Sequence, residues 1–341
     1  MIPVAVLTGF LGSGKTTLLS RLLRSPQFSR TAVIINELGE VGLDHELVET
    51  SEESFVELST GCLCCTVRSD LVLTLEDLLR RRDAGTVPAF ERVAIETSGL
   101  ADPAPILHAL MGDARLAARL GLAGVAATVD AVNGLATLAG RPEAVKQVAL
   151  ADRLVLTKTD LAPAHPALHA RLAALNPAAR LITASFGAID PAELFPPAGD
   201  GGAGLGADTA ARLARNGGHS HGEEVACFAL VREAPIRAVA LTLLLEALAE
   251  HLGAGLLRLK GLVNVAESPD RPAVVHGVQH VFHPPAWLER WPSADRRTRL
   301  VLIGFGLRLD WVEALLAALE AEVEEAHADP RPLLPPGPGR R

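Results

Sequence analysis

The first sixteen residues restrict the possible fold more than any other stretch of this 341-residue sequence. An apolar run, Val4 to Leu7, leads into GFLGSGKT, which has the G-x-x-x-x-G-K-T spacing of a phosphate-binding loop. Glycines let backbone N–H groups turn toward phosphate oxygens, and the helix that follows directs its positive dipole end at the same anion. A glycine-rich turn is the simpler alternative, but the strand before the loop and the helix after it favour the phosphate site.

Two side chains of this loop have chemical roles in a nucleotide site. Lys15 supplies a positive charge for the β- and γ-phosphates, and the hydroxyl of Thr16 is placed to ligate Mg²⁺. A phosphate loop between a buried-type strand and a helix is typical of α/β domains. The sequence therefore predicts a P-loop NTPase domain with a mainly parallel sheet.

Composition argues against several classes of partner. The formal net charge of −8 disfavours non-specific binding to nucleic acid or to anionic membranes. No uninterrupted apolar run reaches about 18–20 residues, so no transmembrane helix is expected. The N-terminus enters the phosphate-loop strand directly, without the pattern of a signal peptide. We therefore expect a cytoplasmic protein.

An acidic, glycine-containing stretch follows the next predicted strand, residues 31–36. Glu37, Glu40 and Asp44 lie in it, interspersed with Gly39 and Gly42. The glycines would let the loop move, and the carboxylates could hold Mg²⁺ directly or through water, or another metal. A solvated acidic turn is the alternative, because such turns are common.

Three of the four cysteines, Cys62, Cys64 and Cys65, fall within four positions, and the fourth is Cys227. This spacing is a poor disulfide framework and a better thiolate cluster for a reducing compartment. A predicted helix follows, capped by Ser69 or Asp70, and a helix N-terminus favours the thiolate form that binds soft or borderline metals. Burial of the cysteines as small apolar side chains is the alternative.

The strand predicted over RVAIETSG ends near Glu96 and Gly99. A strand-end carboxylate in the same α/β unit as a phosphate loop occupies the Walker B position, where Glu96 would approach Mg²⁺ or its water shell. The alternative is a strand-end glutamate that faces solvent.

The strand RLVLTKTD ends in Thr157, Lys158, Thr159 and Asp160. A carboxylate at Asp160 can accept two hydrogen bonds from the ring N–H and amino group of guanine, which adenine cannot supply. The stem of Lys158 can lie along the base. The usual motif is N-K-x-D, so Thr157 replaces the asparagine. The pattern predicts GTP in preference to ATP.

The composition divides the chain into four parts, predicted as 1–195, 196–222, 223–328 and 329–341. The second is a glycine-rich linker that carries His219 and His221, either a weak metal site or ordinary polar linker. The third has the order β-α-β-β-β-α, which indicates an antiparallel sheet with helices on one face. The fourth is a proline-rich tail that we expect to be disordered.

Three histidines lie near one predicted strand of the third part, AVVHGVQHVFH. His276 and His280 share strand parity, so we expect them to face the same side, with His283 nearby. The sequence leaves two interpretations of these histidines: they pack across strands, or they bind a metal or a partner.

The motifs GFLGSGKT, NELGEVGLD, CLCC, ETSG and TKTD, in that order, resemble the CobW branch of the CobW–HypB–UreG family of P-loop GTPases. KGLVN and HGVQHVFHPPAWLERWP resemble the CobW C-terminal domain. The resemblance covers nearly the whole chain except the linker and the tail. Two features depart from the family pattern: Thr157, and the short pair of linker histidines where many relatives carry a longer tract.

The resemblance implies GTP binding, slow GTP hydrolysis and delivery of a transition metal, Zn²⁺ or alternatively Co²⁺, to a metal-requiring client protein. It implies catalytic roles for Lys15, Glu37 and Glu96, and the Mg²⁺ and switch machinery would include Thr16, Glu37, Asp44 and Glu96. The delivered metal would be held by Cys62, Cys64 and Cys65. The implied nucleotide-binding residues are Gly9, Gly12, Ser13, Gly14, Lys15, Thr16, Thr17, Lys158 and Asp160.

Other functions remain open at this stage. A kinase or ATP-dependent synthase would use the same phosphate loop, but Asp160 and the cysteines argue against it. A GTP-dependent metal sensor that recruits a partner without metal transfer would share the site of a carrier. A nucleotide-dependent homodimer is a further partner to test.

Overall fold

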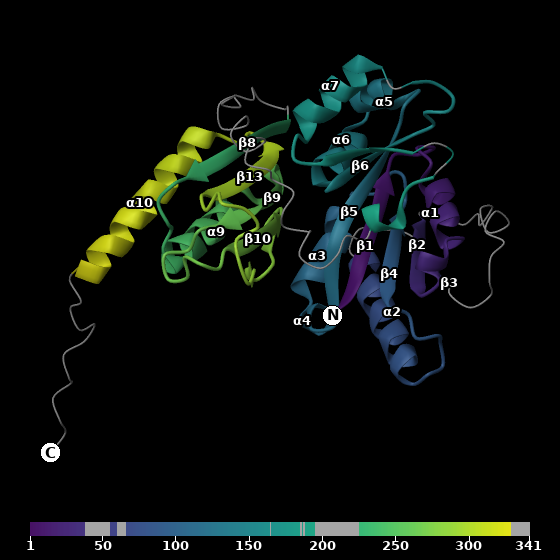
Figure 1. Ribbon diagram of the computed structural model, residues 1–341, viewed down its shortest axis with the longest axis horizontal. Coiled ribbons are helices and arrows are strands. Elements are labelled where there is room, and N and C mark those ends of the chain that lie inside the picture. Colours follow the sequence, from purple (N-terminus) through teal and green to yellow (C-terminus); the bar gives the residue numbers. More distant parts are fainter. Residues whose placement is uncertain are drawn as a thin grey trace.

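The computed structural model describes residues 1–37, 55–59, 66–163, 165–184, 186, 188–194 and 225–328. These residues form two sheets with their helices, placed side by side, and the far end of the long helix near the C-terminus extends beyond the second sheet (Figure 1). The predicted linker 196–222, the predicted tail 329–341 and the cysteine cluster lie outside the described residues.

The first sheet has seven parallel strands in the order β3-β2-β4-β1-β5-β6-β7. The strand bounds are Ile2–Gly9 (β1), Thr31–Glu37 (β2), Phe55–Ser59 (β3), Arg92–Thr97 (β4), Leu120–Asp130 (β5), Arg153–Thr157 (β6) and Arg180–Thr183 (β7). Continuous apolar strands of this kind are typical of a parallel sheet that is covered on both faces. The predicted α/β class is confirmed.

Helices cover both faces of this sheet. Their bounds are Lys15–Leu23 (α1), Thr66–Asp83 (α2), Ala104–Gly112 (α3), Ala114–Ala117 (α4), Gly134–Gly140 (α5), Pro142–Leu150 (α6) and Pro166–Leu175 (α7), with short 3₁₀ turns at Pro26–Phe28 (η1) and Pro191–Glu193 (η3). Leu7 faces the apolar side of α1, whereas its neighbour Val6 packs with α2 and α3 on the other face. This alternation follows from the two-residue period of a strand.

The predicted start of α2 was wrong. The helix begins at Thr66, the residue after Cys65, so Ser69 and Asp70 lie inside the helix, after its first residue, and cannot be its N-cap. No helix breaker separates Thr66 from Ser69, which allows the helix to extend toward the cysteine cluster.

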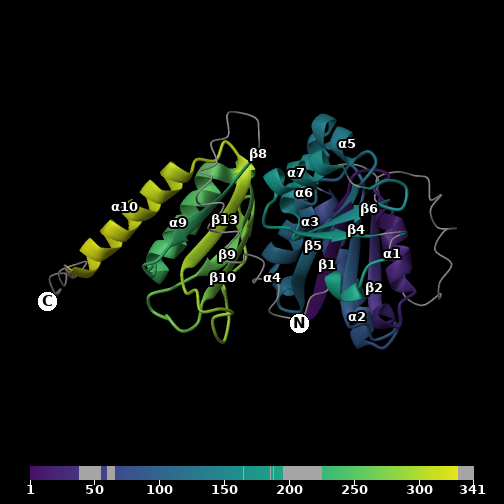
Figure 2. The same ribbon diagram turned by 45° about the horizontal axis from the view of Figure 1, so that its top comes forward.

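The second sheet is antiparallel, with the path β11-β10-β9-β13-β8 and β12 paired to β10. Its strands are Val225–Arg232 (β8), Leu256–Val263 (β9), Ala273–Val278 (β10), Val281–Phe282 (β11), Ala286–Trp287 (β12) and Thr298–Phe305 (β13). The helices Ala238–Leu252 (α9), followed by the turn Gly253–Gly255 (η4), and Leu309–Ala328 (α10) share one apolar core with one face of the sheet (Figure 2). Helices on one face of an antiparallel sheet were predicted, and this is confirmed.

The prediction of one strand over residues 273–283 was wrong. The chain turns at Gln279, whose φ is 52°, and a hairpin joins β10 to β11. His276 therefore lies partly buried in β10, whereas His280 is exposed in the turn, so strand parity does not relate them. The turn contains none of the residues that usually mark a hairpin, and this explains the error.

One helix in the described part of the chain, Ala238–Gly255 including α9, is long and apolar enough to cross a membrane. A buried core helix passes the same test, so this finding does not contradict the expectation drawn from uninterrupted apolar runs. Leu241, Leu244 and Leu248 of α9 are buried against the antiparallel sheet, as in a core helix of a folded domain.

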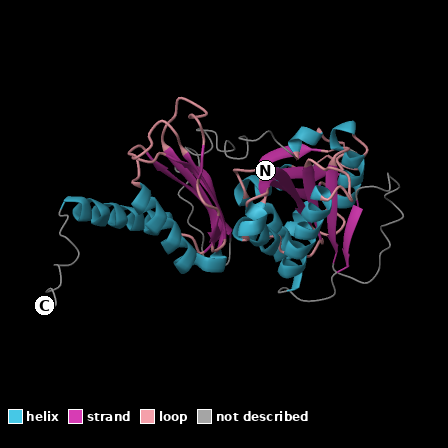
Figure 3. Ribbon diagram, turned by 90° about the horizontal axis from the view of Figure 1, so that it is seen from below, coloured by secondary structure: helices cyan, strands magenta, loops and turns pink. Residues whose placement is uncertain are grey.

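The free face of the second sheet packs against the first domain (Figure 3). Ala149 of α6 lies in one apolar cluster with Ala229, Leu257 and Val301 of this sheet. Beside the cluster, Asp152 accepts hydrogen bonds from Arg258 over 2.6 Å and from Lys260 over 2.8 Å. These contacts connect the C-terminal sheet to the start of β6.

Candidate nucleotide site

The phosphate loop joins β1 to α1 at the carboxyl edge of the parallel sheet. Gly9, Gly12 and Gly14 have φ values of 139°, 69° and 91°, which glycine adopts without the strain of a side chain. A Cβ atom at Gly9 would also collide with Thr128 of β5. The ammonium of Lys15 donates to the carbonyls of Gly9 over 3.0 Å and of Phe10 over 3.4 Å, so Lys15 also holds the loop in shape.

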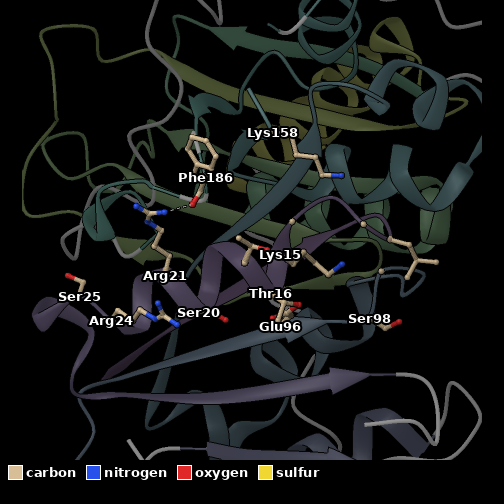
Figure 4. Close-up of a pocket in the computed structure, with 15 residues that line it drawn as sticks. Lys15, Thr16, Ser20, Arg21, Arg24, Ser25, Glu96, Ser98, Lys158 and Phe186 are labelled. Atoms are coloured by element: carbon tan, nitrogen blue, oxygen red, sulfur yellow. Dashed lines mark hydrogen bonds between the residues drawn. The ribbon is translucent and has the colours of Figure 1, made fainter. Parts of the chain in front are cut away.

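A cavity of about 1010 Å³ opens above this loop (Figure 4). Lys158 and Phe186 lie on one side of Lys15 in the view, and Glu96 and Ser98 lie on the other. The predicted nucleotide-binding residues that line the cavity are Gly12, Gly14, Lys15, Thr16, Thr17 and Lys158. Gly9, Ser13 and Asp160 do not line it, although Gly9 and Ser13 lie in the loop beneath it and Asp160 lies in the loop after β6.

Glu96 and Thr16 meet at the floor of the cavity. The hydroxyl of Thr16 donates to Oε1 of Glu96 over 2.8 Å, and Glu96 is 1% exposed. The alternative of a solvent-facing glutamate is therefore wrong. A hydroxyl and a carboxylate are the hard oxygen donors that Mg²⁺ prefers, so the residues present fit this ion.

The loop after Glu96 is packed against the phosphate loop. A Cβ atom at Gly99 would lie 2.7 Å from the backbone nitrogen of Leu11, too close for any other residue. The amide of Gln147, on α6, donates to the carbonyls of Gly99 and Ala101 over 3.1 Å each. Helix α6 thus fixes the loop that follows the Walker B strand.

The loop after β6 is held on both flanks. The hydroxyl of Thr157 donates to the carbonyl of Ser13 over 2.6 Å, and that of Thr159 donates to the carbonyl of Ala184 over 3.1 Å. Between them, Lys158 has a left-handed φ of 58°. The carboxylate of Asp160, which is exposed, accepts from the backbone N–H of Phe186 over 3.2 Å.

Sequence reasoning missed Asp130, the last residue of β5. Its carboxylate accepts from the ammonium of Lys158 over 2.8 Å and from the amide of Asn133 over 3.0 Å. Burial alone would raise the pKa of Asp130, but these two hydrogen bonds and those of nearby backbone amides hold it below the ordinary carboxyl value. The signal in the sequence was a carboxylate directly after an apolar strand.

Several predicted site residues fall outside the described part of the chain: Glu40, Asp44, Cys62, Cys64, Cys65, His219 and His221. Glu37 is the last residue of β2, and its side chain also lies outside the described part. Among the residues that the structure describes, no group of three or more His, Cys, Asp or Glu side chains is arranged to hold a metal ion.

Comparison with known proteins agrees with this geometry over nearly the whole chain. Residues 3–183 match the CobW/HypB/UreG nucleotide-binding domain, and residues 225–320 match the C-terminal domain of the cobalamin synthesis protein CobW. The zinc chaperone YjiA of Escherichia coli is 34% identical over 318 residues, covering 93% of this chain and 98% of that protein. The zinc chaperone CobW of a Sinorhizobium species is 30% identical over 353 residues, covering 89% and 92%.

A solved structure extends the comparison to three dimensions. The crystal structure of Zn(II)-bound YjiA GTPase from Escherichia coli superposes with a TM-score of 0.69 at 29% identity, and the match covers 93% of this chain and 98% of that one. Both the parallel and the antiparallel domain lie within the matched length. The chain therefore belongs to the CobW/HypB/UreG family of P-loop GTPases and carries the CobW C-terminal domain.

Proposed function

We propose that this protein is a GTP-dependent metallochaperone that delivers Zn²⁺ to a metal-requiring client protein in the cytoplasm. The observation that carries the proposal is similarity along nearly the full length to two proteins named as zinc chaperones, with 34% and 30% identity. The phosphate loop, the Thr16–Glu96 pair and the loop after β6 supply the GTPase part of that function.

In this proposal the nucleotide lies in the cavity of about 1010 Å³ with its phosphates on the loop from Gly12 to Thr17. Thr16 and Glu96 would hold Mg²⁺, which supplies charge neutralisation at the γ-phosphate. Lys15 adds a fixed positive charge at the same end. Asp160 selects guanine through its carboxylate, because ATP would leave that acceptor without its two donors.

The cargo metal is assigned to Cys62, Cys64 and Cys65. Three thiolates leave the fourth position of a tetrahedral Zn²⁺ site for water, for Glu37 or Glu40, or for a ligand of the client. An incomplete site suits a carrier that must release its metal. GTP would order the acidic segment that includes Asp44, and hydrolysis would release it, so that the metal affinity differs between nucleotide states.

Co²⁺ titration tests the metal site, because thiolate ligation gives a charge-transfer absorption that oxygen and imidazole ligands do not. We expect about one Co²⁺ per chain and loss of the absorption in Cys64→Ala and Cys65→Ala. Cys227→Ala is the matched control. Burial raises the pKa of Cys227 to about 12, which keeps it a thiol, so its removal leaves the absorption unchanged.

Titration with GTP–Mg²⁺ and with GDP–Mg²⁺ then tests the gating. Metal affinities that differ by about 5-fold or more support it, and the metal must change nucleotide affinity by the same factor. An absorption that survives both cysteine substitutions contradicts the site. Equal metal affinities with GTP and with GDP would be consistent with a metal site but would contradict a carrier gated by the nucleotide.

A second candidate, delivery of Co²⁺, is favoured by the match of residues 225–320 to a domain of the cobalamin synthesis protein. Competition between Zn²⁺ and Co²⁺ for the same thiolates separates the two metals. Transfer of bound metal to an apo-client, with GTP and with GDP, separates a carrier from a sensor that shares the site.

A further inference from the structure

Lys158 stands between two cavities. It lines the cavity of about 1010 Å³ above the phosphate loop and also a smaller one of about 170 Å³ beside that loop. Asp130 lines the smaller cavity only. The ammonium of Lys158 lies 2.8 Å from Oδ2 of Asp130, so its charge is directed to a carboxylate that lines the smaller cavity.

The two oxygens of Asp130 have separate partners. Oδ1 accepts from the backbone N–H groups of Val132 over 2.7 Å and of Asn133 over 3.3 Å, which closes the turn after β5. Oδ2 accepts from Lys158 and from the side-chain amide of Asn133. Asp130 is 8% exposed, so water screens this ion pair less than it would at the surface.

The backbone of Lys158 also needs support. A left-handed φ is unfavourable for a residue with a Cβ atom, and here it is 58°. The carbonyl of Lys158 accepts from Leu161 over 3.0 Å and from Ala162 over 3.3 Å, which anchors its main chain. Within the described part of the chain, the side chain of Lys158 is anchored by its hydrogen bond to Asp130.

We propose that Asp130 is a positioning residue for nucleotide binding, which holds the Lys158 ammonium out of the main cavity so that the aliphatic stem forms a platform for the base. This inference rests on the base site proposed above. Without the Asp130 carboxylate, the long side chain of Lys158 regains its rotamer freedom. Nucleotide binding must then order that side chain, and the lost entropy weakens the affinity. The base is bound alike before and during hydrolysis, so Asp130 should affect affinity and not the chemical step.

The substitution Asp130→Asn tests this with little change of shape. An asparagine keeps an oxygen for the turn amides but presents an NH₂ group to the Lys158 ammonium, which repels it. We expect GTP and GDP to bind about 10-fold more weakly, measured by calorimetry, with kcat at saturating GTP unchanged. Equal losses for GTP and GDP place the effect at the base end rather than at the γ-phosphate.

A double-mutant cycle with Lys158→Met distinguishes positioning of Lys158 from a merely structural role of Asp130. If Asp130 acts through Lys158, then Asp130→Asn has no further effect on affinity once Lys158 is methionine. Glu320→Gln is the matched control, because Glu320 pairs with Arg232 over 2.7 Å at similar exposure in the C-terminal domain. It should leave nucleotide affinity unchanged.

Three outcomes overturn the inference. If Asp130→Asn binds GTP as tightly as the wild type while Lys158→Met binds it more weakly, then Asp130 does not position Lys158. The proposed base site is not affected by that result. If the double variant binds GTP more weakly than Lys158→Met alone, then Asp130 acts through the turn after β5 and not through Lys158. No effect of Lys158→Met shows that anchoring the Lys158 side chain does not matter for binding, since methionine keeps an apolar stem and loses the anchor; the base site itself is then decided by Asp160→Asn. If Asp130→Asn does not fold, Asp130→Ser replaces it, because a hydroxyl also accepts turn amides.

Discussion

The hydroxyl of Thr157 donates a 2.6 Å hydrogen bond to the backbone carbonyl of Ser13, which ties the end of β6 to the phosphate loop. Thr157 stands where the usual guanine motif has asparagine, and it is 4% exposed. A shorter side chain thus links the two halves of the nucleotide site. The departure from the motif therefore does not by itself remove the contact between the loops.

We expect Thr157→Val to weaken binding of both GTP and GDP by about 5- to 10-fold, because it leaves the Ser13 carbonyl without this donor at a cost of about 1 kcal/mol. Thr157→Ser retains the hydroxyl and should bind within about 2-fold of the wild type. Calorimetric titration of the two variants checks this. Equal affinities for valine and serine would contradict the role of the hydrogen bond.

We expect Asp160→Asn to shift selectivity from guanine toward xanthine nucleotides by about 10²-fold or more. The amide supplies a donor that suits the extra carbonyl of xanthine. It also keeps an oxygen for the N–H of Phe186, which lies 3.2 Å from Asp160, so the loop should persist. Competition between GTP and xanthosine triphosphate measures the shift, and a variant that still prefers GTP would contradict the assignment.

We expect Asp152→Asn to lower the free energy of unfolding by about 3–5 kcal/mol, because Arg258 and Lys260 would lose the charge of their shared buried partner. Asp270→Asn is the control. Asp270 pairs with Arg296 at the surface, where 83% of its side chain is exposed, so its loss should cost less than about 1 kcal/mol. Urea unfolding compares the two, and similar losses would contradict this reasoning.

His276 should make the protein less stable in mild acid. Burial and the nearby charges of Lys260, Arg258 and His283 lower the pKa of His276 to about 3, and only Asp152 opposes this shift. Its ordinary value is about 6.5, so between these values the unfolded state binds more protons than the folded state. The free energy of unfolding therefore falls as the pH decreases through this window, by about 1.4 kcal/mol per pH unit.

Unfolding in urea at several pH values between about 4 and 6.5 checks the contribution of His276. Above about pH 5 the carboxyl of Asp152 contributes little slope, because its stabilisation is lost as the pH falls through its ordinary pKa toward the lowered pKa of the folded state. The slope between about pH 5 and 6.5 therefore reports on His276. His276→Gln should reduce the slope, and the exposed His280→Gln should leave it in place. An unchanged slope in His276→Gln would contradict the assignment.

The sequence alone was sufficient for features that depend on local order along the chain. The spacing of Gly9, Gly14, Lys15 and Thr16 predicted the phosphate loop, and apolar strands alternating with helices predicted the parallel sheet. The predicted bounds of these elements agree with the structure to within a few residues. Glu96 was predicted near Mg²⁺ because it follows an apolar strand in the same α/β unit as the phosphate loop. The roles of the cysteines and of Asp160 stay predictions.

Only the tertiary structure decided which distant side chains meet. Asp130 and Lys158 are 28 residues apart, and Asp152 and Arg258 are 106 apart. The first pair forms because β5 and β6 are neighbours in the sheet, and the second because the free face of the C-terminal sheet packs against the other domain. Sequence spacing encodes the period of one helix or strand, whereas these pairs depend on strand order and on the packing of two separate layers, which no local pattern records.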